Sequence, residues 1–381
     1  MHLSRRSVLL LPASLALPLA AKPKTFQLFV GAYTNPANKG IKVCRFDPAT
    51  GKPGALELAA ESPNPSFLAV HPSNRFVYAA NEVGNFQGQR AGAVSAFGLD
   101  PATGKLSPLN QVSSRGPGPC HLSADHKGRA LVVANYSGGS VASYQVGSDG
   151  KLSEAVSFIQ HTGKGPNAKR QEGPHAHCAN ISKDDRFAVV ADLGTDQVHV
   201  YTLDAAAGKL APNQPPYTKI APGAGPRHFA FHPNAKFAYV INELNSTLIA
   251  FRWDGARGTL TEIDTVPTLP AGWTGSSTCA EVFVHPSGNF IYGSNRGHDS
   301  IAVFRVDKKT GKLSLVEHVP TQGRMPRNFV IDPSGRWLIV ANQATNNIVF
   351  FQLDSKTGKL TPTGEKLETY APVCLVFAPA L

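Results

Sequence analysis

The segment EGPHAHC, residues 172–178, places His175 and His177 on either side of a single alanine. Two histidines this close are typical of a metal site or of acid–base chemistry, because imidazole titrates near neutral pH and binds metal ions. Which chemistry applies depends on the residues that meet the pair in space. The strands and loops that position His175 and His177 therefore decide their role.

One pattern of two short apolar strands joined by a turn, often opened by proline and closed by asparagine, recurs along the chain. Its copies are 65–82, 119–136, 175–193, 226–243, 279–296 and 326–343, and a truncated copy, 372–381, comes last. Glycine-containing turns such as DPATGKL (100–106) recur in step and also number seven. Glycine and aspartate suit tight turns between strands.

The repeating unit is thus about four short antiparallel strands in roughly 50 residues, which predicts an all-β, seven-bladed β-propeller. The last copy supplies only an inner strand. Residues 26–34 and 41–46 are therefore expected to complete its blade and close the ring. We expect residues 22–381 to form this single domain.

Residues 1–21 differ from the rest, with a basic start, an apolar run from Val8 and a small-residue end, which is the shape of an export signal. The arginine pair resembles a twin-arginine signal, with an ordinary secretory signal as the alternative. The apolar run is too short and too broken by proline to span a membrane. We expect an exported protein, periplasmic or extracellular, and a monomer.

The balance of charged residues and the cysteines limit the classes of partner and metal site that the sequence supports. Without the two arginines of the signal, the chain has 35 basic residues (37 minus 2) and 26 acidic ones. The basic residues are scattered and not interleaved with aromatic ones, so nucleic acid is not an expected partner. An anionic small molecule fits the excess of positive charge. The five cysteines show no C-x-x-C spacing, which supports neither a zinc site nor a redox motif.

A functional position should differ between the copies, whereas a scaffold position should look alike. The start of the first strand reads Ser66, Cys120, His177, Arg227, Ala280 and Arg327. The end of the second reads Glu82, Tyr136, Leu193, Glu243, Arg296 and Gln343. In a hairpin the start of one strand lies beside the end of the other, and in a propeller all such ends share one rim of the central channel. The loop 161–173 opens onto the same rim, where binding residues tend to sit.

His177, Arg227, Glu243 and Arg327 are therefore expected to converge, and the set is chemically coherent. Arginine forks bind carboxylate or phosphate and stabilise an oxyanion. A histidine and a carboxylate supply the general acid and base, with His177 and Glu243 both open as the base. Glu82 matches Glu243 in blade position and is a further candidate substrate contact, as is His175.

The other histidines have plainer interpretations. Those in repeated His-Pro turns are expected to belong to the scaffold: His71, His232 and His285. His121 and His228 are expected to point away from the channel. We expect no metal, because we place His175 and His177 on opposite sides of the chain and because the rim is too cationic for Ca²⁺, which needs several oxygen ligands.

Several motifs together resemble the seven-bladed lactonase family, which includes propeller 6-phosphogluconolactonases and carboxymuconate-lactonizing enzymes. The specific ones are RQEGPHAH (170–177) and the pairing of GPRH (225–228) with NEL (242–244). The resemblance implies a metal-independent lactone enzyme without a cofactor. It implies that the family's His, Arg, Glu and Arg correspond to His177, Arg227, Glu243 and Arg327. Arg170 and Gln171 match the RQ of the family loop and are expected to contact substrate.

The expected function is hydrolysis of a sugar-acid lactone, 6-phosphogluconolactonase-like, by activation of water on a substrate held by arginines. Two alternatives remain open. One is lactonization of a muconate-like diacid, a cycloisomerase reaction. The other is a periplasmic binding or interaction propeller without catalysis, because a propeller fold alone never establishes an enzyme.

Overall fold

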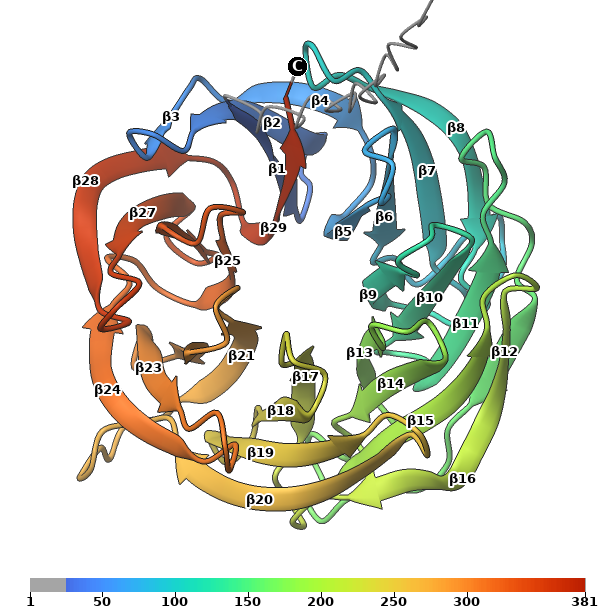
Figure 1. Cartoon of the computed structure of the whole chain (residues 1–381). Coiled ribbons are helices and arrows are strands. Elements are labelled where there is room, and N and C mark those ends of the chain that lie inside the picture. The colour runs from blue at the N-terminus through green and yellow to red at the C-terminus, as the bar shows by residue number, and fades with distance from the viewer. Residues whose placement is uncertain (1–24, 381) are drawn as a thin grey trace, which may run out of the picture.

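The computed structural model describes residues 25–380, and the expected export signal lies outside this range. The described chain forms seven antiparallel β-sheets arranged as the blades of a propeller around a central channel (Figure 1). The predicted all-β, seven-bladed fold is confirmed. Within residues 25–380 no helix is long and apolar enough to cross a membrane.

Six blades each consist of four consecutive strands. In each blade the first strand lies at the central channel and the last lies at the outer edge. Three of them contain β5 (Pro65–Val70), β6 (Phe76–Asn81), β7 (Ala93–Leu99) and β8 (Leu106–Ser113); β9 (Pro119–Ala124), β10 (Ala130–Asn135), β11 (Ser140–Gln145) and β12 (Ser157–Gln160); and β13 (Ala176–Ile181), β14 (Phe187–Asp192), β15 (Gln197–Asp204) and β16 (Lys209–Lys219). The next three contain β17 (Pro226–Phe231), β18 (Phe237–Asn242), β19 (Thr247–Asp254) and β20 (Thr259–Pro267); β21 (Thr278–Val284), β22 (Phe290–Arg296), β23 (Ser300–Val306) and β24 (Leu313–Pro320); and β25 (Pro326–Ile331), β26 (Trp337–Asn342), β27 (Asn347–Leu353) and β28 (Leu360–Glu368).

The seventh blade joins the two ends of the described chain, as the truncated repeat predicts. Its innermost strand β29 (Pro372–Pro379) pairs with β1 (Phe26–Ala32), which pairs with β2 (Gly40–Asp47). The short strands β3 (Lys52–Pro53) and β4 (Glu57–Glu61) both pair with β2. The ladder between β1 and β29 therefore closes the ring.

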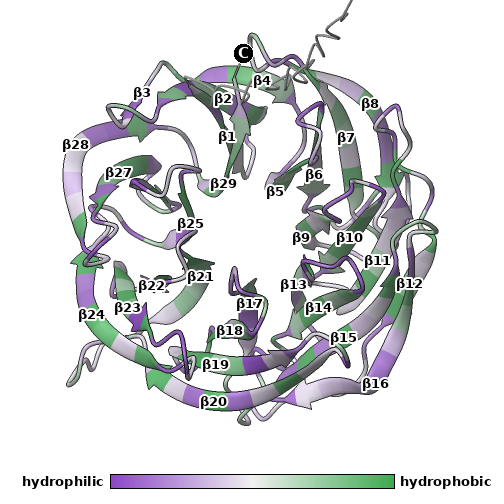
Figure 2. Ribbon diagram, viewed as in Figure 1, coloured by the Kyte–Doolittle hydropathy of each residue, from purple (hydrophilic) through white to green (hydrophobic). Residues whose placement is uncertain are grey.

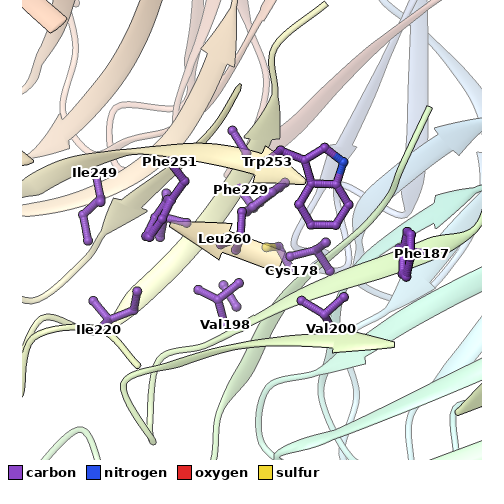
Figure 3. Close-up of a cluster of buried hydrophobic side chains, with 14 of the residues drawn as sticks. Cys178, Phe187, Val198, Val200, Ile220, Phe229, Ile249, Phe251, Trp253 and Leu260 are labelled. Carbon is purple, nitrogen blue, oxygen red and sulfur yellow. The ribbon is translucent and has the colours of Figure 1, made fainter. Parts of the chain in front are cut away.

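The core lies between adjacent blades. One such cluster brings Cys178 and Val198 of one blade against Phe229, Phe251 and Trp253 of the next (Figure 3). A completely buried phenylalanine contributes about 2 kcal/mol through removal of its surface from water. Figure 2 shows hydrophobic residues along inner strands such as β10 and more hydrophilic ones on outer strands such as β16.

The His-Pro turns are scaffold, as expected, because their histidines tie neighbouring blades together. Each Nε2 donates a hydrogen bond of 2.9 Å to a turn carbonyl of the next blade: His71 to Gly128, His232 to Gly288 and His285 to Gly335. Each of these rings is at least nine-tenths buried.

Candidate active site

A β-bulge at the start of the inner strands aims the predicted residues. The pairing register of β17 with β18 shifts between Pro226 and His228, which leaves Arg227 unpaired. The same shift occurs at His177 in β13 and at Arg327 in β25. A bulge bends the strand and re-aims the extra side chain. The three residues therefore occupy the same bulge position at the start of their inner strands.

Glu243, which directly follows β18, lies at the centre of a charged cluster. Its Oε2 accepts a hydrogen bond from Arg227 Nε at 3.0 Å and forms an ion pair with Arg296 Nη2 at 2.8 Å. Its Oε1 accepts one from Arg170 Nη2 at 2.5 Å. Burial by itself would raise the pKa of this carboxyl, but the guanidinium groups of Arg296, Arg227 and Arg170 outweigh burial and lower the pKa to about 2. Glu243 is therefore a carboxylate at neutral pH.

Arg227 is one of the most buried charged groups in the described chain, with 1 % of its surface exposed. Burial, together with the like charges of Arg296 and Arg327, lowers its pKa to about 10. It remains a cation at neutral pH, because that pKa lies well above 7. The cluster thus carries more positive than negative charge, since three arginines contact one carboxylate.

His177 is buried beside this cluster. Burial, followed by the charge of Arg227 and the neighbouring ring of His228, holds the pKa of His177 well below its usual range. Its Nδ1 lies 3.8 Å from Cys120 Sγ, and among residues 25–380 its Nε2 has no hydrogen-bond partner. His177 is therefore neutral at pH 7, with a ring nitrogen able to accept a proton.

Tyr136 brings His175 and His177 together. The ring of His175 stacks on Tyr136 with centroids 4.5 Å apart, and the ring of His177 meets Tyr136 edge-on at 5.2 Å. The expectation that the two histidines lie on opposite sides is wrong, because both rings contact Tyr136. His175 Nε2 lies 3.2 Å from Glu172 Oε1, and its Nδ1 donates to the carbonyl oxygen of Tyr136.

Glu82 and Arg327 meet at Tyr33, which follows β1. Tyr33 Oη donates a hydrogen bond of 3.0 Å to Glu82 Oε2, and the guanidinium carbon of Arg327 lies 5.8 Å from the centre of the Tyr33 ring. Burial raises the pKa of Tyr33 to about 12, so its hydroxyl is protonated at neutral pH. Arg327 also lowers the pKa of His177, which places it within electrostatic reach of that ring.

The loop 161–173 delivers one of its two predicted residues to the cluster. Arg170 Nη2 reaches Glu243 and also donates to Tyr136 Oη at 3.2 Å. Gln171 lies completely buried beneath the loop, where its Nε2 donates to the carbonyl oxygen of Leu193 and its Oε1 accepts from the backbone of Asn167. Its contact with substrate stays a prediction.

The expectation that His121 and His228 point away from the channel is wrong. Both line a central cavity of about 510 Å³ that residues of all seven inner strands enclose. His228 Nδ1 lies 2.8 Å from Glu281 Oε1, and Asn328 donates to the other carboxyl oxygen. Burial raises the pKa of Glu281 to about 7. This second polar layer lies directly against the first, because the rings of His228 and His177 are 5.3 Å apart.

Three residues of the cluster were not among the predicted ones: Arg296, Tyr136 and Tyr33. Arg296 and Tyr136 occupy the same position at the end of the second strand that drew attention to Glu243 and Glu82, so the repeat register could have found them. Tyr33 occupies the corresponding position of the closing blade, so the same register extended to residues 26–34 could have found it as well.

The fold and the site together define a class: a seven-bladed propeller whose channel holds a neutral buried histidine beside a carboxylate bound by arginines. The family model described as lactonase, 7-bladed beta-propeller, matches residues 27–377. The chain belongs to this family.

Similar proteins cover most of the chain. A 6-phosphogluconolactonase of Bacillus subtilis (strain 168) is 39% identical over 305 residues, which are 80% of this chain and 84% of the relative. A 6-phosphogluconolactonase of Formosa agariphila is 35% identical over 310 residues, 80% of this chain and 86% of the relative. The solved structure of a periplasmic gluconolactonase of Pseudomonas aeruginosa matches with a TM-score of 0.87 at 33% identity, covering 94% of this chain and 100% of that one.

Proposed function

We propose that this chain hydrolyses a small sugar-acid lactone, with His177 as the general base and the arginines as the groups that hold the substrate and the developing oxyanion. Membership of the lactonase family supports the reaction class. The surplus of guanidinium groups at one end of the channel supports an anionic or strongly hydrogen-bonding substrate.

The observation that carries the assignment is the contrast between the two candidate bases. Both carboxyl oxygens of Glu243 already accept hydrogen bonds from arginines, and its pKa of about 2 makes it a poor proton acceptor. His177 is neutral and its Nε2 is free of protein partners among the described residues. Glu243 then keeps Arg227 and Arg296 aligned and leaves proton transfer to His177.

The reaction follows from these roles. His177 Nε2 takes a proton from water, and the resulting hydroxide attacks the lactone carbonyl carbon. The carbonyl electron pair moves onto oxygen, where a guanidinium such as that of Arg227 or Arg327 stabilises the negative charge. The electron pair returns, the ring C–O bond breaks, and the ring oxygen leaves as a hydroxyl with the proton from His177. The product is an open-chain hydroxy acid.

The test is hydrolysis of a lactone panel by the purified protein without added metal. Glucono-δ-lactone, 6-phosphogluconolactone and a muconate separate hydrolysis from lactonization, with acid release followed in a pH-stat and muconate by ultraviolet absorbance. His177→Asn should lower kcat on the preferred lactone about 100-fold or more, the size of general base catalysis. His232→Asn, which alters an equally buried scaffold histidine, should retain kcat.

Two results would contradict the proposal. Unchanged kcat in His177→Asn would remove the base from this residue. Stabilisation of the protein by a lactone without turnover on any member of the panel would indicate a binding propeller instead.

We also propose export to the periplasm or beyond, which the apolar start of the sequence and the periplasmic location named for the Pseudomonas aeruginosa structure support. Fractionation and an N-terminal mass measurement test it. A protein retained in the cytoplasm with residues 1–21 intact would contradict it. Size-exclusion chromatography with light scattering tests the expected monomer.

A further inference from the structure

The blade of β13–β16 carries an acidic residue at a position that the proposed reaction does not use. Five blades carry asparagine at or next to the end of the second strand: Asn81, Asn135, Asn242, Asn295 and Asn342; the closing blade has Ala32 there. In the blade of β13–β16 the same position is Asp192. The residue that closes the outer strand of the preceding blade is also changed, because His161 stands where the other blades have Ser62, Ser114, Ile220, Thr268, Thr321 or Thr369. Among those six, Ile220 alone lacks a hydroxyl.

The two changes form a matched pair. In another blade Asn295 Nδ2 donates to the backbone oxygen of Thr268, and Asn342 does the same to Thr321. A carboxylate only accepts hydrogen bonds, so Asp192 needs a donor in that place. His161 provides it: its Nδ1 lies 2.5 Å from Asp192 Oδ2, and its Nε2 accepts from Tyr201 Oη at 2.7 Å.

The other carboxyl oxygen of Asp192 serves the candidate active site. Its Oδ1 accepts backbone hydrogen bonds from His175, Gly194 and Thr195 at 2.9, 3.0 and 3.1 Å. By contrast, the Oδ1 atoms of Asn135, Asn242 and Asn342 are buried without a partner among the described residues. Asp192 thus binds His161 at the first end of the loop 161–173 and His175 just beyond its second end.

The loop 161–173 also packs against the turn that follows β14. Gln171 is completely buried and bonds the carbonyl oxygen of Leu193, the neighbour of Asp192. Gly194 leaves no room for a side chain, since an added Cβ would lie 1.9 Å from the carbonyl oxygen of Gly173. The loop therefore closes tightly onto the turn that Asp192 organises.

We propose that Asp192 and His161 are positioning residues that fasten the loop 161–173, and so place Arg170 on Glu243 and His175 on Tyr136. A metal ion shared by His161, Asp192 and His199 fits the observed geometry less well. The rings of His161 and His199 stack with centroids 3.9 Å apart, so their lone pairs do not converge, and both nitrogens of His161 already have partners.

The test is the double variant His161→Thr with Asp192→Asn. It gives this blade the same threonine–asparagine pair that Thr268 and Asn295 form in another blade. The exposed Lys164 and Lys169, with Arg170, make trypsin cleavage of the loop a direct measure of its opening. Cleavage tracks the population of the open form. A buried hydrogen bond to a charged group stabilises by an amount that corresponds to a ~10-fold or larger change in that population, so we expect cleavage at least ~10-fold faster.

Two further variants keep the test decisive. Asn342→Asp changes the same position in a blade without a long loop, and should leave loop cleavage at the wild-type rate even if the protein loses stability. Gly194→Ala displaces the loop end without removing the Asp192–His161 pair, and should also speed cleavage. A wild-type cleavage rate in the double variant, with faster cleavage in Gly194→Ala, would overturn the inference.

The activity measurement rests on the proposed function, whereas proteolysis does not. If the chain is a lactonase, the double variant should raise KM at least several-fold, because Arg170 is no longer held at the cluster, while the melting temperature changes little. Fast cleavage without any lactone turnover in the wild type would leave the positioning role supported and the reaction refuted. Unchanged KM together with unchanged cleavage would refute the positioning role alone.

Discussion

Replacing Glu243 by glutamine removes the negative charge that Arg170, Arg227 and Arg296 share. The pKa of Glu243 is about 2 in the folded protein, against an ordinary value of 4.5. A shift of that size corresponds to roughly 3 kcal/mol of stabilisation, at 1.36 kcal/mol per pKa unit. The side chain is 4 % exposed, so solvent screens this interaction little.

The sign of the effect defines the assay. Because folding lowers the pKa, the stabilisation is complete above about pH 4.5 and is lost as the pH falls through 2. Urea denaturation should therefore show Glu243→Gln less stable than the wild type by roughly 3 kcal/mol at pH 7. That difference should shrink as the pH approaches 2, where the wild-type carboxyl is itself protonated.

Glu82→Gln is the matched control. Glu82 occupies the equivalent position of another blade and accepts its hydrogen bond from Tyr33, a neutral donor. Its replacement should cost about 1 kcal/mol or less. A gap between wild type and Glu243→Gln that is the same at pH 7 and at pH 2.5 would refute the reasoning, because the carboxylate charge would then not be the source of the stability.

Two shorter predictions follow from neighbouring residues. Arg296→Gln should raise KM for the preferred lactone ~10-fold or more while Arg296→Lys partly retains binding, and initial-rate kinetics that show equal KM in all three proteins would contradict a substrate role for Arg296. Glu281→Gln should become more stable relative to the wild type as pH rises from about 4.5 to 7, because burial raises the pKa of Glu281 to about 7 and ionisation therefore penalises the folded wild type in that window. Thermal melts across this range check it, and a constant difference would count against it.

The repeat made most of the fold predictable. Two markers in seven copies gave the blade count, and the truncated last copy implied that the first strands close the ring, as β1 and β29 do. The same register placed Arg227 and Glu243 in contact although 16 residues separate them in the chain. Such inference works because each blade repeats one hairpin around a common axis.

What the sequence could not supply was the direction of individual side chains. The bulges that free His177, Arg227 and Arg327 from the strand pairing carry no clear sequence mark. His121 and His228 directly follow Cys120 and Arg227, so a regular strand would point them away from the side on which those residues lie. The observed irregular register instead lets both line the channel.

The electrostatics of the cluster link substrate binding to base strength. Positive charge on Arg227 and Arg327 lowers the pKa of His177, which keeps the imidazole unprotonated but makes it a weaker base. In the proposed reaction, the same charges stabilise the oxyanion that forms when hydroxide attacks, and so offset the loss of basicity in the transition state. Glu243 sets this balance, because its charge partly neutralises the arginines while its two oxygens fix their directions. In the proposed reaction, the Glu243 carboxylate therefore contributes to catalysis without transferring a proton.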